Sequence, residues 1–179
     1  MKHSTVAKLA AMAALGALSQ GAFAADGTIN FTGEIVDAPC SIAPASQNLI
    51  VPMGRVSRPA LDGAAGKRAT PARFSIALRD CGATAKGATV SFTGATDATV
   101  KDLLRIANSG QVGAGSATGV AIELGDSAGT KIPVGAQSAV YTLGQGSNDL
   151  DFQAAYVSTG EAVTVGPANA TAQFTVTYR

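Results

Sequence analysis

Short stretches in which apolar and polar residues alternate recur along this chain, and they constrain its fold more than any other feature. A period of two is typical of strands that bury one face. Gly, Asn, Asp and Pro separate the stretches, the chain has 21 Gly, and no long helical stripe is present. The sequence therefore predicts an all-β antiparallel sandwich. The segments expected as strands are 28–36, 49–53, 74–78, 89–93, 119–124, 150–156 and 170–178.

Several segments are harder to assign. Residues 49–53 are apolar but include Pro52, which suits an edge strand or a bulge. Residues 103–106 fit either a strand or one helical turn, and both interpretations stay open. The Gly-rich stretches 62–71 and 108–118 are expected to be loops that are too short to separate two domains. The chain is long enough to form one domain with its own hydrophobic core.

The first 24 residues have the three parts of a secretory signal peptide. Lys2 and Lys8 make the start basic, residues 9–18 are apolar, and residues 22–24 form an A-x-A cleavage site. The apolar stretch is too short to span a bilayer. We expect cleavage after Ala24, with Ala25 as the alternative. Removal of 24 residues from 179 leaves a mature chain of 155.

Charge and composition argue against several classes of protein. The 13 basic and 12 acidic residues give a net charge of +1, which becomes −1 once the two signal-peptide lysines are removed. A nucleic-acid partner is not expected without a basic excess. The one histidine, His3, lies in the signal peptide and is removed with it. The mature chain therefore has no histidine for nucleophilic catalysis and lacks the commonest zinc ligand.

The remaining traces of site chemistry are weak. Asp149 and Asp151 alternate with apolar residues, which indicates the solvated face of a strand rather than a catalytic pair. The glycines of 113–119 miss the dinucleotide-binding spacing by one residue and lack the strand and helix around it. We therefore expect no enzyme, no metal site and no cofactor.

Two cysteines, Cys40 and Cys81, lie in the mature part. An even count in an exported chain predicts a disulfide. Free buried thiols or a redox pair are the alternatives, but the chain has no C-x-x-C motif. The bond would close a loop with a sequence separation of 41 and contribute about 4 kcal/mol by restricting the unfolded chain.

The mature N-terminus is an apolar-faced strand at a free end. Its opposite face is polar, and terminal residues are usually disordered unless something holds them. Such a strand predicts a groove that receives it. Two alternatives stay open: the segment is the first strand of its own domain, or it folds into its own groove. The apolar face consists of Gly27, Ile29, Phe31, Gly33 and Ile35.

The C-terminal run has a matching apolar face and ends almost at Arg179. A sandwich that needs one more strand beside this run must take it from another molecule. An unfilled slot would leave an apolar groove and an unpaired sheet edge, which is an aggregation hazard. The alternative is that these are ordinary core residues of a complete sandwich. The face consists of Ala170, Ala172, Phe174, Val176 and Tyr178.

Together these features resemble those of the structural subunits of chaperone–usher pili, the type 1 fimbrial pilin family. The resemblance covers essentially all of the mature chain. It is carried by residues 31–40, by residues 74–81 with the spacing from Cys40 to Cys81, by residues 150–156, and by the C-terminal pattern in which Gly166 is fourteenth from the end and Tyr178 is penultimate.

The resemblance implies an incomplete immunoglobulin-like β-sandwich that lacks its last strand. It divides the chain into a signal peptide (1–24), an N-terminal donor-strand extension (25–37) and a pilin domain (38–179). In that family a periplasmic chaperone lends a strand, and at the outer-membrane usher the next subunit's extension replaces it. The donor strand would present Gly27, Ile29, Phe31, Gly33 and Ile35. The acceptor groove and chaperone contact would include Gly166, Phe174, Val176 and Tyr178.

The resemblance thus predicts a non-enzymatic fimbrial subunit. It would pass through the periplasm to the cell surface, polymerise with neighbouring pilin subunits by donor-strand exchange and support cell adhesion. The alternative is a minor tip or adaptor subunit, or a small adhesin that binds a host glycan or protein receptor. The extension argues against the distal tip, and 155 residues leave no room for a separate receptor-binding domain.

Overall fold

The computed structural model describes residues 27–35, 38–110 and 115–179. It divides into two units, Met1–Val36 and Asp37–Arg179. The predicted signal peptide and both cleavage sites lie outside the described residues. Residues 27–35, in the first unit, are exposed and form no helix or strand within the described part of the chain. The strand expected there is therefore not formed in the single chain, since a β-strand requires a hydrogen-bonded neighbour.

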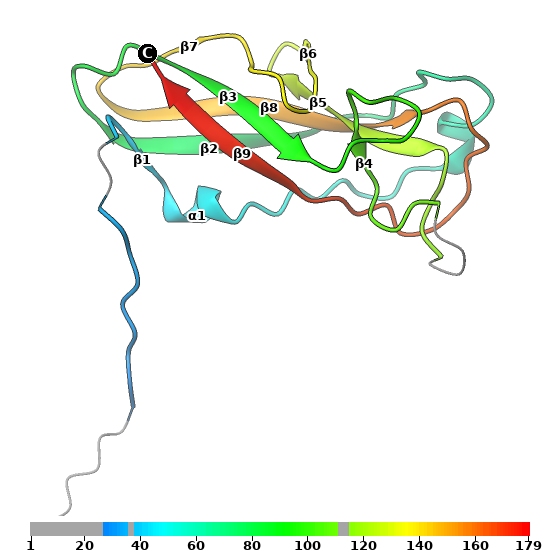
Figure 1. Cartoon of the computed structure of the whole chain (residues 1–179), viewed down its shortest axis with the longest axis horizontal. Coiled ribbons are helices and arrows are strands. Elements are labelled where there is room, and N and C mark those ends of the chain that lie inside the picture. The colour runs from blue at the N-terminus through cyan, green and yellow to red at the C-terminus, as the bar shows by residue number, and fades with distance from the viewer. Residues whose placement is uncertain (1–26, 36–37, 111–114) are drawn as a thin grey trace, which may run out of the picture. The chain divides into compact units, whose positions relative to one another are not determined.

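The described residues of the second unit form two antiparallel sheets (Figure 1). Within the larger sheet the order is β1 (Ser41–Ile42), β2 (Ala72–Cys81), β8 (Gly146–Ser158), β5 (Val120–Asp126) and β4 (Leu104–Arg105), with β6 (Lys131–Ile132) paired to β5. The smaller sheet has the order β7 (Tyr141–Thr142), β3 (Gly87–Gly94) and β9 (Ala172–Tyr178). The two helices found among the described residues are short, α1 (Pro44–Gln47) and the 3₁₀-helix η1 (Arg58–Ala60).

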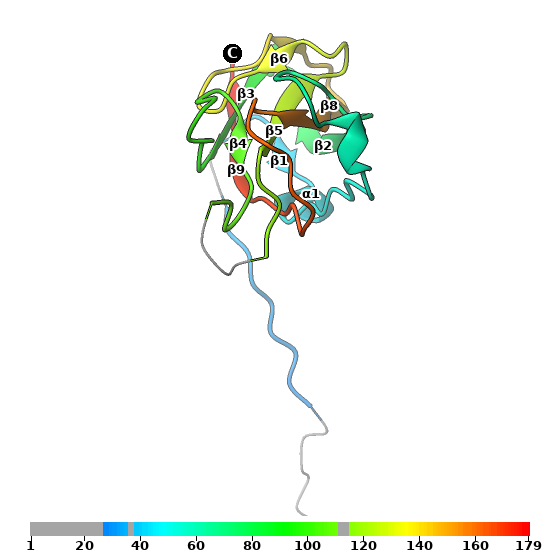
Figure 2. The same ribbon diagram turned by 90° about the vertical axis from the view of Figure 1, so that its right-hand side faces the viewer.

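The two sheets form the layers of a sandwich, with β3 and β9 crossing over β2 and β8 (Figures 1 and 2). The rings of Phe92 on β3 and Phe152 on β8 meet edge to face, with 5.1 Å between their centroids, and so join the layers. Phe74 lies opposite Phe152 in the register of β2 and β8 and stacks on it. Of the described helices, neither has the length and apolar character that a membrane crossing requires.

Most of the expected strands are confirmed. The runs 74–78, 89–93 and 150–156 lie within β2, β3 and β8, and the runs 119–124 and 170–178 overlap β5 and β9, which begin at Val120 and Ala172. The ambiguous run 103–106 contains β4. The expected strand at 49–53 is wrong, because residues 49–57, all of which the structure describes, form no helix or strand. Pro52 has no N–H to donate, and Gly54 has a φ of +70°, which a strand does not accommodate.

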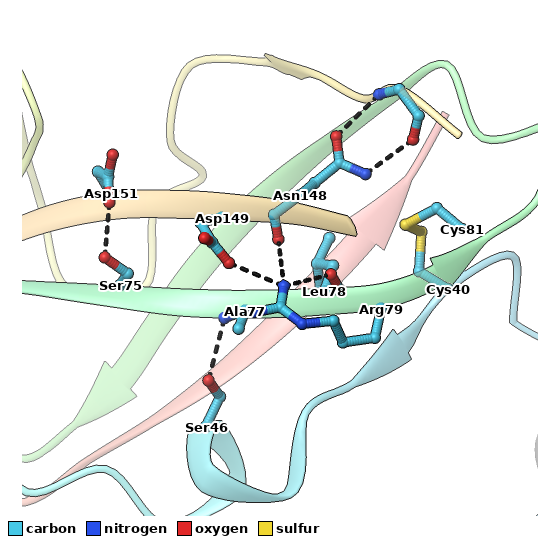
Figure 3. Close-up of polar contacts among 11 residues, drawn as sticks. Cys40, Ser46, Ser75, Ala77, Leu78, Arg79, Cys81, Asn148, Asp149 and Asp151 are labelled. Carbon is cyan, nitrogen blue, oxygen red and sulfur yellow. Dashed lines mark hydrogen bonds and ion pairs between the residues drawn. A yellow bond between two sulfur atoms is a disulfide. The ribbon is translucent and has the colours of Figure 1, made fainter. Parts of the chain in front are cut away.

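The predicted disulfide is confirmed. Cys40 and Cys81 are bonded and buried, and the bond joins the start of the domain to the end of β2 (Figure 3). The interpretation of Asp149 and Asp151 is also confirmed, because both are exposed on the outer face of β8. Arg79 pairs with Asp149 at 2.8 Å, and the Ser75 hydroxyl donates to Asp151 (Figure 3).

Candidate strand-binding groove

The last strand, β9, is an edge strand. Among the strands that the structure describes, it pairs with β3 alone. Arg179 and Gly87 exchange two backbone hydrogen bonds of 2.8 and 3.2 Å. Because hydrogen-bonded and non-hydrogen-bonded pairs alternate along an antiparallel ladder, Tyr178, Val176 and Phe174 direct their own N–H and C=O groups away from β3. The same three residues pack apolar side chains, half-buried, against the core.

A cavity of about 620 Å³ opens beside the start of β9. One wall is the segment 49–54, and the other wall runs from Ala168 to Phe174. The floor is the inner face of the sandwich, and it is apolar. Its residues include Phe74, Phe92, Ile122, Leu124 and Ala154.

A second cavity of about 330 Å³ continues the first in the direction of η1. Gly54, Tyr156, Ala168 and Asn169 line both cavities, so the two form one elongated groove with walls 49–58 and 163–174. The rims carry exposed apolar side chains, Ile50 at 91% and Val165 at 78%. We call this feature the groove.

Tyr156, on β8, marks the junction of the two cavities. Its ring is buried, and its hydroxyl donates to the carbonyl oxygen of Ala168 at 2.7 Å. Burial raises the pKa of this hydroxyl above its usual value. The hydrogen bond ties one wall of the groove to its floor.

The other end of β9 is anchored close to the disulfide. The Tyr178 hydroxyl donates to the carbonyl oxygen of Cys40 at 3.3 Å, and burial raises its pKa. The amides of Lys86 and Gly87 donate to the carbonyl oxygen of Arg179. The end of β9 is therefore held by the side-chain hydrogen bond of Tyr178 and by the backbone hydrogen bonds to Lys86 and Gly87.

The structure places the predicted acceptor residues at different points of this region. Phe174 lines the larger cavity and Gly166 lines the smaller one. A Cβ at Gly166 would collide with the backbone of Gly115 and Ala117, so no side chain fits there. Val176 and Tyr178 lie on the same face of β9 as Phe174 but beyond the cavity lining.

The predicted donor residues lie in the first unit with their apolar groups unburied. Ile29, Phe31 and Ile35 are 78%, 90% and 101% exposed. A Cβ built on Gly27 or Gly33 would meet nothing within 4 Å. The donor and acceptor roles of all these residues stay predictions.

Sequence reasoning missed the wall 49–58 and the junction residue Tyr156. The apolar run 49–53 was visible, but its pattern suggested a strand rather than a groove wall. A tyrosine within the buried run 150–156 was also a usable signal, because a buried phenol hydroxyl needs a hydrogen-bond partner. The structure supplies that partner from the opposite wall.

No group of three or more His, Cys, Asp or Glu side chains that could hold a metal ion is found among the residues with described positions. The floor of the groove offers apolar surface, and the edge of β9 beside it offers backbone hydrogen-bonding groups. Its geometry suits the addition of a strand to a sheet edge.

Residues 29–179 match the model of a protein family described as Fimbrial protein. The chain belongs to the fimbrial protein family. A relative named Probable major fimbrial subunit LpfA, from Escherichia coli O157:H7, is 40% identical over 172 residues, which cover 94% of each chain. The relatives support a structural fimbrial subunit, found in surface fimbriae.

Two solved structures extend the comparison. A type I fimbria protein and antigen of Burkholderia pseudomallei is 41% identical, with a TM-score of 0.60 over 85% of this chain and 97% of that one. A subunit in the structure of a chaperone–usher pilus, solved to explain rod uncoiling, is 28% identical, with a TM-score of 0.70 over 87% and 96%. The fimbrial subunit thus has an immunoglobulin-like sandwich, belongs to the chaperone–usher class and contacts neighbouring pilin subunits.

Proposed function

We propose that this fimbrial subunit polymerises by donor-strand exchange, in which residues 27–35 of one copy fill the groove of another copy. The observation that carries the proposal is an apolar groove beside a strand edge whose backbone groups have no partner among the described residues. A strand in this position would pair through its backbone with the free edge at the start of β9, where Ala172 and Phe174 lie. Its alternate side chains would enter the groove.

The length of residues 27–35 agrees with the length of the groove wall. Residues 27–35 span roughly 30 Å when extended, at about 3.3 Å per residue. The wall 166–174 has the same number of residues. Burial of Ile29, Phe31 and Ile35 in the groove would remove apolar surface of both copies from water.

The order of residue sizes along the extension matches the shape of the groove. Ile29 and Phe31 would occupy the larger cavity, Gly33 would cross Tyr156, and Ile35 would occupy the smaller cavity. This direction is antiparallel to β9. With Gly33 at the junction, the opposite direction would put Phe31 and Ile29 in the smaller cavity and leave Ile35 alone in the larger one.

An empty groove of this kind exposes apolar surface and a free sheet edge, which promotes aggregation. We infer that a periplasmic chaperone covers the groove with its own strand and contacts β9 and Arg179 during export. At an outer-membrane usher, the extension of the next subunit would then replace the chaperone strand. The relatives described as a major subunit and as part of a rod favour a place in the fimbrial shaft.

Replacement of Phe31 by Arg tests the proposal. The charged side chain would have to enter the apolar floor of the groove, so polymerisation should stop while the Cys40–Cys81 bond still forms. Thr32→Arg is the matched control, because Thr32 lies on the opposite, polar face. Assembly is measured by electron microscopy of fibres and by the ladder of boiling-resistant polymers on a gel.

Mixing experiments make the test stricter. A Phe31→Arg copy keeps an intact groove, so it should accept a wild-type extension without donating its own and should shorten wild-type fibres. Fibres of normal length from Phe31→Arg alone would overturn donor-strand exchange. A monomer filled by its own extension would be recognised by its mass.

A further inference from the structure

Two arginines stand at the end of the groove that contains the smaller cavity. Arg55 and Arg58 line this cavity and are exposed at the surface. Arg58 lies 4.0 Å from Asp62, and both side chains of that pair are about half exposed, so the pair is weak. Arg55 takes part in none of the ion pairs found among the described residues. The groove therefore has a positively charged end.

Residues 27–35 carry a single charged side chain, that of Glu34. It is exposed and follows the polar face of the extension. Neighbouring residues of a strand point to opposite faces. When Ile35 fills the smaller cavity, Glu34 consequently lies at the rim of that cavity. In the opposite direction, with Ile29 at this place, the neighbouring residues would be the uncharged Thr28 and Asn30.

We propose that Arg55 and Arg58 bind the Glu34 carboxylate of a second copy of this chain, and that this contact fixes the direction and register of the inserted strand. The inference rests on the proposed donor-strand exchange. Apolar contacts alone specify register weakly here, because a slip of two residues keeps the same face inward. Such a slip moves Glu34 by about 7 Å, beyond the reach of an ion pair with the same arginines.

Charge reversal in the full-length chain tests the contact. Glu34→Arg, and separately Arg55→Glu combined with Arg58→Glu, should each slow polymer growth roughly tenfold at low ionic strength, since charges at an interface rim act mainly on association. All three changes together should restore most of the rate. High salt should reduce the differences. Arg73→Glu, which reverses the charge of one exposed residue of β2 away from the groove, is the control and should polymerise at the wild-type rate.

Cross-linking tests direction independently of rate. Glu34→Cys together with Arg55→Cys should yield a covalent ladder on a non-reducing gel. Thr28→Cys together with Arg55→Cys should not. A ladder from the Thr28 pair and none from the Glu34 pair would show the opposite direction and overturn the inference.

The charge contact and strand exchange fail in different ways. If the reversed variants grow at the wild-type rate while Phe31→Arg still blocks growth, the contact is wrong and strand exchange stands. If Phe31→Arg also polymerises normally, strand exchange itself is wrong, and the inference falls with it. Glu34→Arg leaves the residues of the folded domain unchanged, so its effect does not depend on the stability of that domain.

Discussion

Strands β8 and β9 have the same alternating pattern but very different surroundings. β8 lies between β2 and β5, and its inward residues Leu150 and Phe152 are only 2% and 1% exposed. β9 pairs with β3 alone among the described strands, and its inward residues, such as Phe174, are only half-buried. Alternation therefore indicates which face of a strand is inward. It does not indicate how completely that face is covered.

The difference has a functional meaning under the proposed mechanism. The surroundings of β8 are completed by the chain itself, whereas those of β9 would be completed by another molecule. Variants in matched positions of the two strands should then separate the stability of one copy from its assembly. The groove also differs from the finished part of the core in having one wall that, over residues 49–57, forms no helix or strand.

The largest difference in the free energy of unfolding is expected between the variants Phe152→Ala and Phe174→Ala. Loss of the fully buried ring should lower the free energy of unfolding by about 3–5 kcal/mol, through transfer and cavity costs. Loss of the half-buried ring should cost roughly 1–2 kcal/mol, because less area is removed from water. Urea unfolding of the two variants measures both values. Equal losses would contradict the view that β9 is incompletely covered.

The second largest difference is expected in the rates at which the backbone amides of β8 and β9 exchange hydrogen with solvent. The amides of Ala172 and Phe174 face the free edge and should exchange about 100-fold more slowly once the chain has polymerised. The amides of Phe152 and Ala154 already have strand neighbours on both sides and should change little. Mass spectrometry or NMR before and after assembly measures this. Unchanged exchange at Phe174 in polymers would argue against an inserted strand.

The two tyrosine hydroxyls allow a finer comparison. Tyr156→Phe removes a buried hydrogen bond of 2.7 Å on β8 and leaves the Ala168 carbonyl without that donor. Tyr178→Phe removes a longer bond of 3.3 Å on β9. We expect losses of about 1.5 and about 0.5 kcal/mol in the free energy of unfolding. Chemical denaturation gives the values, and a larger loss for Tyr178 would reverse the comparison.

A smaller effect is expected at alkaline pH. Burial, followed by the nearby Asp126 and Asp151 charges, raises the pKa of Tyr141 from 10.0 to about 12. The folded state thus holds the phenol proton more tightly than the unfolded state. This contribution to stability is present below pH 10 and is lost as the pH rises towards about 12. Tyr141→Phe should flatten that part of the curve of unfolding free energy against pH, and an equally steep curve would exclude Tyr141 as its source.

The sequence predicted most of the fold because its signals are local. The periodicity of 150–156 identified a strand with Leu150 and Phe152 inward, and two cysteines in an exported chain allowed one intramolecular pairing. The expectation of a strand at 49–53 failed for a different reason. An apolar run indicates burial against something, but its backbone conformation depends on Pro52, on Gly54 and on whether a neighbouring strand is available.

By itself the sequence determined the inward faces of the strands, the Cys40–Cys81 bond and the apolar face of residues 27–35. These properties follow from side-chain periodicity and from the count of cysteines. Only the tertiary structure decided that 49–58 and 163–174 face each other, that Tyr156 divides the space between them, and that Arg55 and Arg58 stand at one end. These relations join segments far apart in the chain, and the packing of the two sheets brings them together.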